Sequence, residues 1–261
     1  MWADLLESAR RRAAALHPRA GELERLAQAA PAPQGFVAAL RGPAVAVIAE
    51  VKRRSPSAGS LRPDLDAARY ARACVAGGAA AVSVLTDPDH FDGSLDDLRD
   101  VAGGVGVPVL RKDFLLDELQ LLEARAAGAS AVLLIVRALD RDRLVALAQA
   151  ARALHLDTLI EVHTHDELET AVAAAPAAVG VNSRDLATFT VDLRAARHVL
   201  ADVPAAMVAV AESGVESRDD VERLAEAGAD AVLVGTALAL HTDPVAAVRA
   251  LTGVPRRGRA S

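Results

Sequence analysis

Short apolar runs recur along the chain, and each is followed by a polar loop and a longer amphipathic stretch. Consecutive apolar positions are typical of strands buried on both faces of a parallel sheet, and the stretches between them have helical spacing. We predict strands at 45–51, 80–85, 107–111, 131–136, 158–162, 178–182, 207–211 and 231–235. We expect the intervening helices to begin near Asp64, Ser94, Asp117, Asp140, His165, Asp192, Ser217 and Asp243. Several of these residues can cap a helix N-terminus, which supports the assignment.

Eight such units within 261 residues favour a single-domain (β/α)8 TIM barrel. A doubly wound open sheet is the alternative, because the same alternation serves both folds, but no G-x-G-x-x-G follows the first predicted strand. Residues 1–40 have apolar residues at helical spacing and are expected to form an N-terminal helical arm packed on the barrel. The barrel would span 41–253, and 254–261 are expected to be a flexible basic tail.

Composition narrows the classes of protein to consider. The chain is 52% hydrophobic and 25% charged, and its net charge of -6 argues against nucleic acid as a partner. The single cysteine, Cys74, cannot form an internal disulfide, which is typical of a reducing cytosol. No signal peptide or apolar run long enough to span a membrane is present in the sequence. We therefore expect a cytoplasmic protein without a membrane partner, as a monomer or weak homo-oligomer.

Lysine and asparagine are used sparingly, and always where a predicted strand ends. Only Lys52 and Lys112 are lysines among 29 basic residues, and Asn182 is the sole asparagine. Glu50 and Lys52 lie two residues apart, so alternation along a strand directs them to the same side. A desolvated lysine can release its proton, so these residues are candidates for acid and base chemistry. The alternative is that they are leftover surface residues.

The carboxyl ends of parallel strands meet in one ring, where barrels hold their active sites. The ring would carry Glu50, Lys52, Thr86, Lys112, Glu161, Asn182, Arg184, Glu212, Ser213, Gly235 and Thr236. Such a set can exchange protons with an anionic small molecule. The glycine-bearing turns at 212–215 and 234–237 suit phosphate. Phe91, Phe114 and Phe189 follow strand ends and suggest a flat apolar moiety, although loop plugs would have the same pattern.

Two histidines follow Glu161 and allow a metal site as an alternative. His163 and His165 would be ligands beside Glu161, but no further ligand occurs at a recognised spacing. We therefore expect no metal, and we interpret the histidines as polar loop groups.

Seven motifs together resemble those of the indole-3-glycerol phosphate synthases of tryptophan biosynthesis. They are, in order, AEVKRRSPSAG, SVLTDPDHFDGSLDDL, VPVLRKDFLLDELQLLEARAAGASAVLLI, LIEVHTHDELETA, VGVNSRDLATFTVDL, AESGV and GADAVLVGTAL. The resemblance covers residues 45–240. It implies a (β/α)8 barrel that converts 1-(2-carboxyphenylamino)-1-deoxyribulose 5-phosphate to indole-3-glycerol phosphate, releasing carbon dioxide and water without a cofactor.

The resemblance also implies roles for individual residues. Lys112 resembles the family's general acid for ring closure, and Glu161 the general base of the later dehydration. The remaining catalytic set implied is Glu50, Lys52 and Asn182. The implied substrate-binding residues are Ser55, Phe91, Phe114, Arg184, Glu212, Leu133 and Leu233. The implied phosphate-binding residues are Ser213, Gly214, Gly235, Thr236 and Lys52. A Schiff-base aldolase and a barrel that binds a phosphorylated aromatic ligand without turnover are the rival hypotheses.

Overall fold

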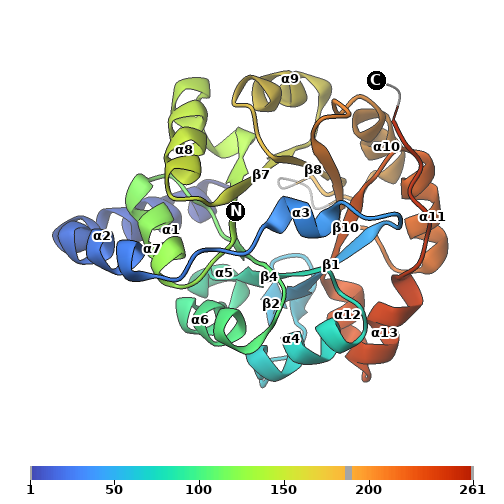
Figure 1. The fold of residues 1–261 in the computed structure, drawn as a ribbon, viewed down its shortest axis with the longest axis horizontal. Helices are drawn as coiled ribbons and strands as arrows, with labels where there is room; N and C mark the ends of the chain where they lie inside the picture. Colours follow the sequence, from blue (N-terminus) through green and yellow to red (C-terminus); the bar gives the residue numbers. More distant parts are fainter. Residues whose placement is uncertain (1, 186–189, 260–261) are drawn as a thin grey trace.

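The computed structural model describes residues 2–185 and 190–259. Among these residues, eight parallel strands close into a barrel in which the first barrel strand pairs with both the second and the last (Figure 1). The strands are β1 (Ala46–Val51), β4 (Ala81–Leu85), β5 (Val109–Lys112), β6 (Ala131–Ile135), β7 (Asp157–Val162), β8 (Ala178–Asn182), β9 (Val208–Glu212) and β10 (Ala231–Val234). The predicted TIM barrel is confirmed, because each predicted strand overlaps an observed one.

Helices surround the barrel and follow the strands in turn. They are α4 (Ala67–Ala76), α5 (Pro88–Phe91), α6 (Leu95–Gly104), α7 (Glu118–Ala126), η2 (Val136–Ala138), α8 (Arg141–Ala153), α9 (His165–Ala173), α10 (Leu193–Ala201), α11 (Arg218–Glu226), α12 (Thr236–Leu240) and α13 (Pro244–Leu251). Most begin at a side chain that accepts a backbone N–H, such as Ser94, Asp140 and Ser217. Each such cap contributes about 1 kcal/mol. No helix within the described ranges is both long and apolar enough to cross a membrane.

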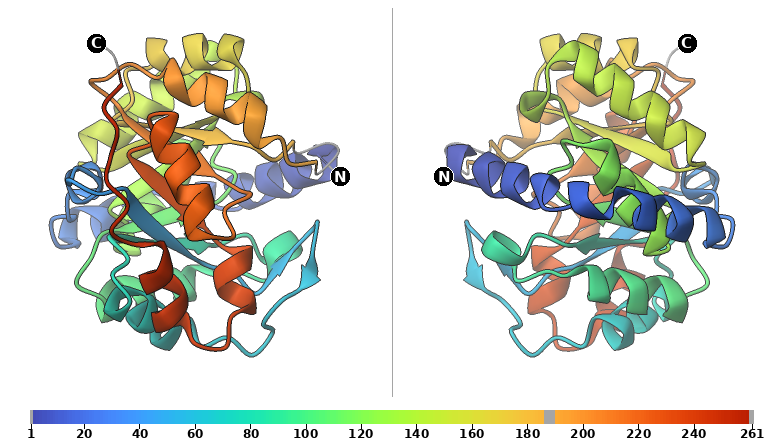
Figure 2. Two further views of the ribbon diagram at one scale, coloured as in Figure 1. Left: turned by 90° about the vertical axis from the view of Figure 1, so that its right-hand side faces the viewer. Right: turned by 90° about the vertical axis from the view of Figure 1, so that its left-hand side faces the viewer.

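The first part of the chain forms helices that cover the barrel. They are α1 (Trp2–Ala14), η1 (His17–Arg19), α2 (Ala20–Ala29) and α3 (Phe36–Leu40). Phe36 and Leu40 are fully buried against the apolar interior of the barrel, and the Val37 N–H donates to Asp157 at the start of β7 (2.9 Å). Hence α3 closes the amino end of the barrel, while α1 and α2 lie along its side (Figure 2).

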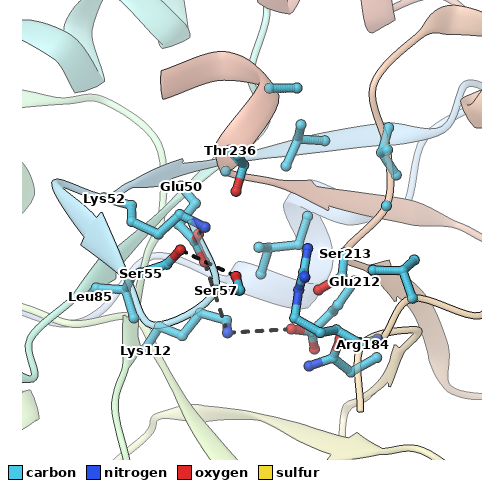
Figure 3. Close-up of a pocket in the computed structure, with 18 of the residues that line it drawn as sticks. Glu50, Lys52, Ser55, Ser57, Leu85, Lys112, Arg184, Glu212, Ser213 and Thr236 are labelled. Atoms are coloured by element: carbon cyan, nitrogen blue, oxygen red, sulfur yellow. Dashed lines mark hydrogen bonds and ion pairs between the residues drawn. The ribbon is translucent and has the colours of Figure 1, made fainter. Parts of the chain in front are cut away.

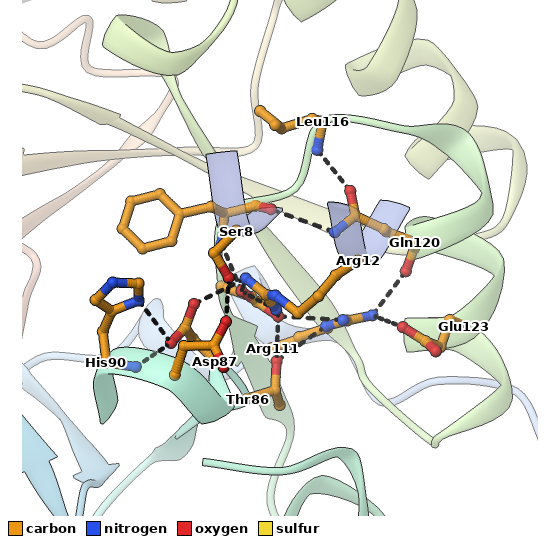
Figure 4. A network of polar contacts seen from close by, with 12 residues as sticks. Ser8, Arg12, Thr86, Asp87, His90, Arg111, Leu116, Gln120 and Glu123 are labelled. Carbon is orange, nitrogen blue, oxygen red and sulfur yellow. Dashed lines mark hydrogen bonds and ion pairs between the residues drawn. The ribbon is translucent and has the colours of Figure 1, made fainter. Parts of the chain in front are cut away.

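A buried ionic network attaches α1 to the barrel (Figure 4). Arg12 of α1 donates to both carboxylate oxygens of Asp113 (2.9 and 3.0 Å) and to Asp87 (2.8 Å). Arg111 and the Thr86 hydroxyl also donate to Asp113, at 3.2 and 2.7 Å. Burial opposes the charge on Asp113, but the two guanidinium groups outweigh it and lower the pKa of Asp113. Thr86 is predicted to belong to the ring at the carboxyl ends of the strands, but in the structure its hydroxyl is part of this ionic network.

The structure differs from the predicted flexible tail over the part of 254–261 that it describes. Arg256 and Arg259 both form ion pairs with Asp230, and Arg259 also donates to the Met207 carbonyl (2.7 Å). Asp230 is buried, and a buried carboxylate requires a compensating cation. These arginines supply that charge, so they lie against the barrel instead of in solvent.

The loop after β1 contains a small hairpin that the sequence did not predict. Its strands are β2 (Arg54–Ser55) and β3 (Gly59–Ser60), and it projects from the same side as the N-terminus (Figure 2). Arg53 anchors the base of the hairpin through Asp97 (2.6 Å). The hairpin brings Ser55 to the carboxyl end of the barrel.

Candidate active site

A cavity of about 450 Å³ lies at the carboxyl ends of the strands (Figure 3). This volume is within the usual range for a small-molecule site. Most of the predicted site residues line this cavity: Glu50, Lys52, Ser55, Phe91, Lys112, Phe114, Asn182, Arg184, Glu212, Ser213, Gly214, Leu233, Gly235 and Thr236. The closure of the barrel therefore brings together residues that are far apart in the sequence.

Lys112, the last residue of β5, lies between three carboxylates. Its Nζ atom is 3.9 Å from Glu50 Oε2, 3.9 Å from Glu161 Oε2 and 3.7 Å from Glu212 Oε2. Burial disfavours the ammonium form, but the three carboxylates outweigh burial and raise the pKa of Lys112. Lys112 is therefore a partly buried ammonium group that can donate a proton to a strongly basic atom placed against it.

Glu50 and Lys52 leave β1 on the same side and form a close ion pair. Lys52 Nζ lies 2.8 Å from Glu50 Oε1. Burial favours the neutral carboxyl, but Lys52 and Lys112 outweigh burial and lower the pKa of Glu50. A Cβ at Gly235 would lie 2.1 Å from Glu50 Oε1 and 2.9 Å from Lys52 Nζ. The glycine at 235 is thus required by the ion pair.

Glu161 and Glu212 come from strands on either side of β8, with Gly180 between them. A Cβ at Gly180 would lie 2.0 Å from Glu212 Oε1, so the absence of a side chain there leaves the space that this carboxyl occupies. Burial and the neighbouring Glu161 charge raise the pKa of Glu212 to about 8, although Lys112 opposes the shift. Near neutral pH, Glu212 therefore holds a proton beside a carboxylate and an ammonium group.

A glycine turn after β9 lies at one end of the cavity. Ser213 and Gly214 have left-handed φ angles of 67° and 73°. A Cβ at Gly214 would lie 2.9 Å from both Val191 and Leu193. The Ser183 hydroxyl donates to the Ser213 carbonyl (3.1 Å) and fixes the turn. The turn is therefore held in a conformation that requires glycine at its second position.

Helix α12 begins at the same end of the cavity. Gly235 is its N-cap, and Thr236 and Ala237 form its first turn. The N–H groups of a first helical turn have no partner within the helix. Such groups, together with a glycine turn, bind phosphate. This end of the cavity is consequently suited to an anion.

Another part of the cavity wall is apolar. Phe91, Phe114, Leu85 and Leu233 line it, and α1 contributes Leu5. Phe114 is buried and makes an edge-to-face contact with Trp2, with ring centroids 5.9 Å apart. Phe189, which the sequence analysis placed with these rings, lies outside the described residues. The apolar wall and the anion-binding end suit a ligand with both an aromatic ring and a charged group.

Besides Thr86, two predicted residues within the described ranges do not line the cavity. Glu161 lies deeper, where it contacts Lys112. Leu133 is buried in the apolar interior of the barrel, because the β6–β7 register places it beside Leu159, while Ile135 lies beside Glu161. Leu133 is thus one layer below the level of Glu161, and the prediction that it contacts a ligand in the cavity is not supported.

Other lining residues had no recognisable signal in the sequence. Leu5 belongs to an ordinary amphipathic helix, and Ser57, Val215 and Ala237 are common loop or helix residues. Within 2–185 and 190–259, no group of three or more His, Cys, Asp or Glu side chains is arranged to hold a metal ion. The alternative with His163 and His165 therefore gains no support.

Comparison with known proteins agrees with the motifs. The family model for indole-3-glycerol phosphate synthase matches residues 4–251. The indole-3-glycerol phosphate synthase of Mycobacterium ulcerans (strain Agy99) is 47% identical over 246 residues, which cover 94% of this chain and 90% of the relative. That of Mycobacterium avium (strain 104) is 48% identical over 227 residues, which cover 87% of this chain and 84% of the relative.

Solved structures show the same fold at low sequence identity. A 3-hexulose-6-phosphate synthase superposes with a TM-score of 0.64 at 16% identity, covering 79% of this chain and 98% of the other. A thiamine phosphate pyrophosphorylase from Pyrococcus furiosus has a TM-score of 0.60 at 16% identity, covering 79% of this chain and 93% of the other. These likenesses concern the barrel alone, whereas the family model and the relatives cover nearly the whole chain. The chain belongs to the indole-3-glycerol phosphate synthase family.

Proposed function

We propose that this chain converts 1-(2-carboxyphenylamino)-1-deoxyribulose 5-phosphate to indole-3-glycerol phosphate, as the carboxy-lyase of tryptophan biosynthesis. The observation that carries the proposal is Lys112, buried among three carboxylates in a cavity that has an anion-binding end and an apolar wall. The substrate carries a phosphate, a carboxylate and an aromatic ring, which match these parts. The reaction needs proton donors and acceptors only, so no cofactor is invoked.

The first step is ring closure, in which an aromatic carbon attacks the ketone carbon. Negative charge develops on the ketone oxygen, and the Lys112 ammonium donates a proton to it. The resulting hydroxyl stays on the new ring. Loss of carbon dioxide from the same aromatic carbon, the one that attacked the ketone, then restores aromaticity and leaves a neutral intermediate. The neighbouring carboxylates raise the pKa of Lys112, so Lys112 stays protonated until negative charge on the ketone oxygen makes that oxygen basic enough to take the proton.

The second step is loss of water. Glu161 removes a proton from the ring carbon next to the hydroxyl, and an ammonium group of the pair Lys52 and Lys112 protonates the departing hydroxyl. Glu50 supports this role because it lies 2.8 Å from Lys52 and 3.9 Å from Lys112. The two steps use two ammonium protons in all. The proton gained by Glu161 can return to the neighbouring Lys112, which is 3.9 Å away, and the other is replaced from solvent, because loss of carbon dioxide from a carboxylate consumes one proton.

Substrate binding is assigned to the remaining lining residues. Arg184 is proposed to contact the substrate carboxylate, and it lies next to Asn182, whose side-chain oxygen accepts the Arg184 N–H (3.0 Å). The proposed aromatic-ring contacts are Phe91, Phe114 and Leu233, with Ser55 and Glu212 on the polar side. The proposed phosphate contacts are Ser213, Gly214, Gly235, Thr236 and Lys52.

The direct test is to mix the purified chain with 1-(2-carboxyphenylamino)-1-deoxyribulose 5-phosphate in the presence of a chelator and to follow indole fluorescence. We expect turnover in wild type and its near-complete loss in Lys112→Ala. Substrate binding without fluorescence would instead support a binding barrel. Absence of both binding and turnover would contradict the proposal.

A Schiff-base aldolase is the less favoured candidate. That mechanism requires a neutral lysine amine to attack a carbonyl. The carboxylates that raise the pKa of Lys112 oppose the neutral form, and Lys52 is held in an ion pair with Glu50. Borohydride trapping of a lysine adduct with a ketose phosphate would favour the aldolase.

The cavity is lined by groups from one chain, so we propose that a monomer is catalytically competent. We expect the specific activity to stay constant on dilution, and sedimentation velocity at the same concentrations tests whether the active species is a monomer.

A cytoplasmic location accompanies the proposal, since the sole cysteine, Cys74, is a free, buried thiol. Fractionation of cells that produce the chain would test the location.

A further inference from the structure

Two buried polar atoms beneath the cavity face each other without a hydrogen-bond partner among the described residues. They are Oε1 of Glu161 and Nε2 of His163, and they lie 3.7 Å apart. The two residues are separated by one position, so both side chains leave the end of β7 on the same side. An unpartnered buried polar atom costs about 1–3 kcal/mol, so two such atoms aimed at each other indicate a contact that forms in the working enzyme.

The two oxygens of Glu161 have different neighbours. Oε2 lies 3.9 Å from Nζ of Lys112, which lines the cavity, and Oε1 lies 3.7 Å from Nε2 of His163, which does not. A group that fixes Oε1 therefore also fixes the direction of Oε2. For a base that removes a proton from carbon, this direction decides whether the oxygen reaches the substrate.

His163 is itself held from behind. Its backbone N–H donates to Glu167 Oε2 (2.6 Å), and its ring Nδ1 lies 3.3 Å from the same oxygen. Glu167 also accepts from Arg137 Nε (2.5 Å), and Arg137 donates in turn to Asp185 (3.0 Å). Burial opposes the charge on Glu167, but hydrogen bonds from His163 and Arg137 outweigh burial and lower the pKa of Glu167 to about 2. The ring thus has a permanent carboxylate on its Nδ1 side.

We propose that His163 is a positioning residue for the dehydration step. The ring donates Nδ1–H to Glu167 and Nε2–H to Glu161 Oε1, so that Oε2 faces Lys112 and the substrate. Oε2 then takes the proton from the ring carbon while water leaves with a proton from a lysine, and His163 itself transfers no proton. The inference rests on the proposed role of Glu161 as the base.

The test compares three variants in the fluorescence assay. His163→Leu removes both ring nitrogens, whereas His163→Gln keeps an N–H donor near the Nε2 position. His165→Ala is the matched control, because its side chain is half exposed and contacts Asp202 at the surface. We expect His163→Leu to lower kcat at least tenfold with KM within twofold, His163→Gln to recover kcat to within threefold of wild type, and His165→Ala to resemble wild type.

A second measurement separates positioning from a structural role. With substrate deuterated at the methylene carbon that loses its proton, we expect a larger isotope effect on kcat for His163→Leu than for wild type, because proton removal becomes slower. If the loss of kcat comes without a change in the isotope effect and without recovery by His163→Gln, His163 only fills space and the proposal is overturned.

Two outcomes distinguish this inference from the function on which it rests. Wild type without any turnover contradicts the proposed function, whereas an active wild type with wild-type kcat in His163→Leu overturns only the role of His163. If His163→Leu does not fold, Glu167→Gln replaces it, since this variant weakens the support of the ring. We then expect about a threefold lower kcat and the same rise in isotope effect, and an unchanged isotope effect would reject the proposal.

Discussion

Lys112 and Asp113 are neighbours in the chain, yet their charges are compensated in opposite ways. Asp113 has both carboxylate oxygens in close hydrogen bonds with Arg12, Arg111 and Thr86, at 2.7–3.2 Å. Lys112 has three carboxyl groups around it, but all lie at 3.7–3.9 Å, and the two oxygens of Glu212 lack hydrogen-bond partners among the described residues. Both oxygens of Asp113 are thus hydrogen-bonded without a ligand, although Arg12 Nε has no partner among the described residues. The Glu212 oxygens beside Lys112 are free to bind substrate atoms.

The largest expected effect concerns the cluster of Lys112 with Glu50, Glu161 and Glu212. Lys112→Ala should reduce kcat by about 10²–10⁴-fold, because the proposed donor to the ketone oxygen is lost. The cluster serves chemistry more than folding, so the circular dichroism spectrum should match wild type. Steady-state kinetics and circular dichroism check both parts, and wild-type kinetics in this variant would remove Lys112 from the mechanism.

Removing Asp113 should have the reverse effect, a loss of stability in place of a loss of turnover. Asp113→Ala removes the buried carboxylate that two arginines share, leaving Arg12 with Asp87 and Arg111 with Glu123. Breaking a buried ion pair from one side typically costs about 3–5 kcal/mol of unfolding free energy. For a domain of this size we expect a fall in Tm of about 6–20 °C. Asp113→Asn keeps some of the hydrogen bonds and should lose less. Thermal unfolding of both variants measures the difference, and an unchanged Tm in Asp113→Ala would show that the network does not stabilise the fold.

A third comparison concerns the space around the carboxylates. In Gly180→Ala the new Cβ would lie 2.0 Å from Glu212 Oε1, so the carboxyl must move away from Lys112 and Glu161. We expect kcat to fall about tenfold or more, as positions near reacting groups tolerate little displacement. Gly103→Ala is the control, since nothing lies within 4 Å of its Cβ and it is helical; it should gain about 0.4–1 kcal/mol of stability and keep its activity. Equal kcat values in the two variants would argue against a role for the space at Gly180.

The sequence predicts the barrel and most of the cavity for one physical reason. The strands of a parallel barrel are covered by helices on the outside, and all of them end at the same face of the barrel. Glu50, Lys112 and Asn182, which lie at strand ends, could therefore be assigned to one site from the sequence alone. Register could not be predicted in the same way. Leu133, which the resemblance implies as a substrate contact, pairs with Leu159, one layer below Glu161.

Long-range contacts were also beyond the sequence. Nothing in an amphipathic N-terminal helix indicates that Leu5 reaches the cavity or that Arg12 reaches Asp113. The arginines of the C-terminal segment look solvated in the sequence because their buried partner, Asp230, is distant along the chain. Gly180 had no visible role, because the side chain that needs its space comes from another strand.

The last expected effect is a pH dependence of the unfolding free energy, which arises from Glu212 in the cluster around Lys112. Burial and the Glu161 charge raise the pKa of Glu212 to about 8 in the folded chain, from an ordinary value of 4.5. Its proton therefore stabilises the fold fully at pH values below 4.5, and this contribution is lost as the pH rises through about 8. Glu212→Gln is neutral at every pH and escapes the loss. The Tm of wild type should therefore fall relative to this variant as the pH rises from 5 to 8.5. Parallel Tm curves over that range would mean that Glu212 is already ionised at pH 5, and that the cluster around Lys112 is as fully compensated as the network around Asp113.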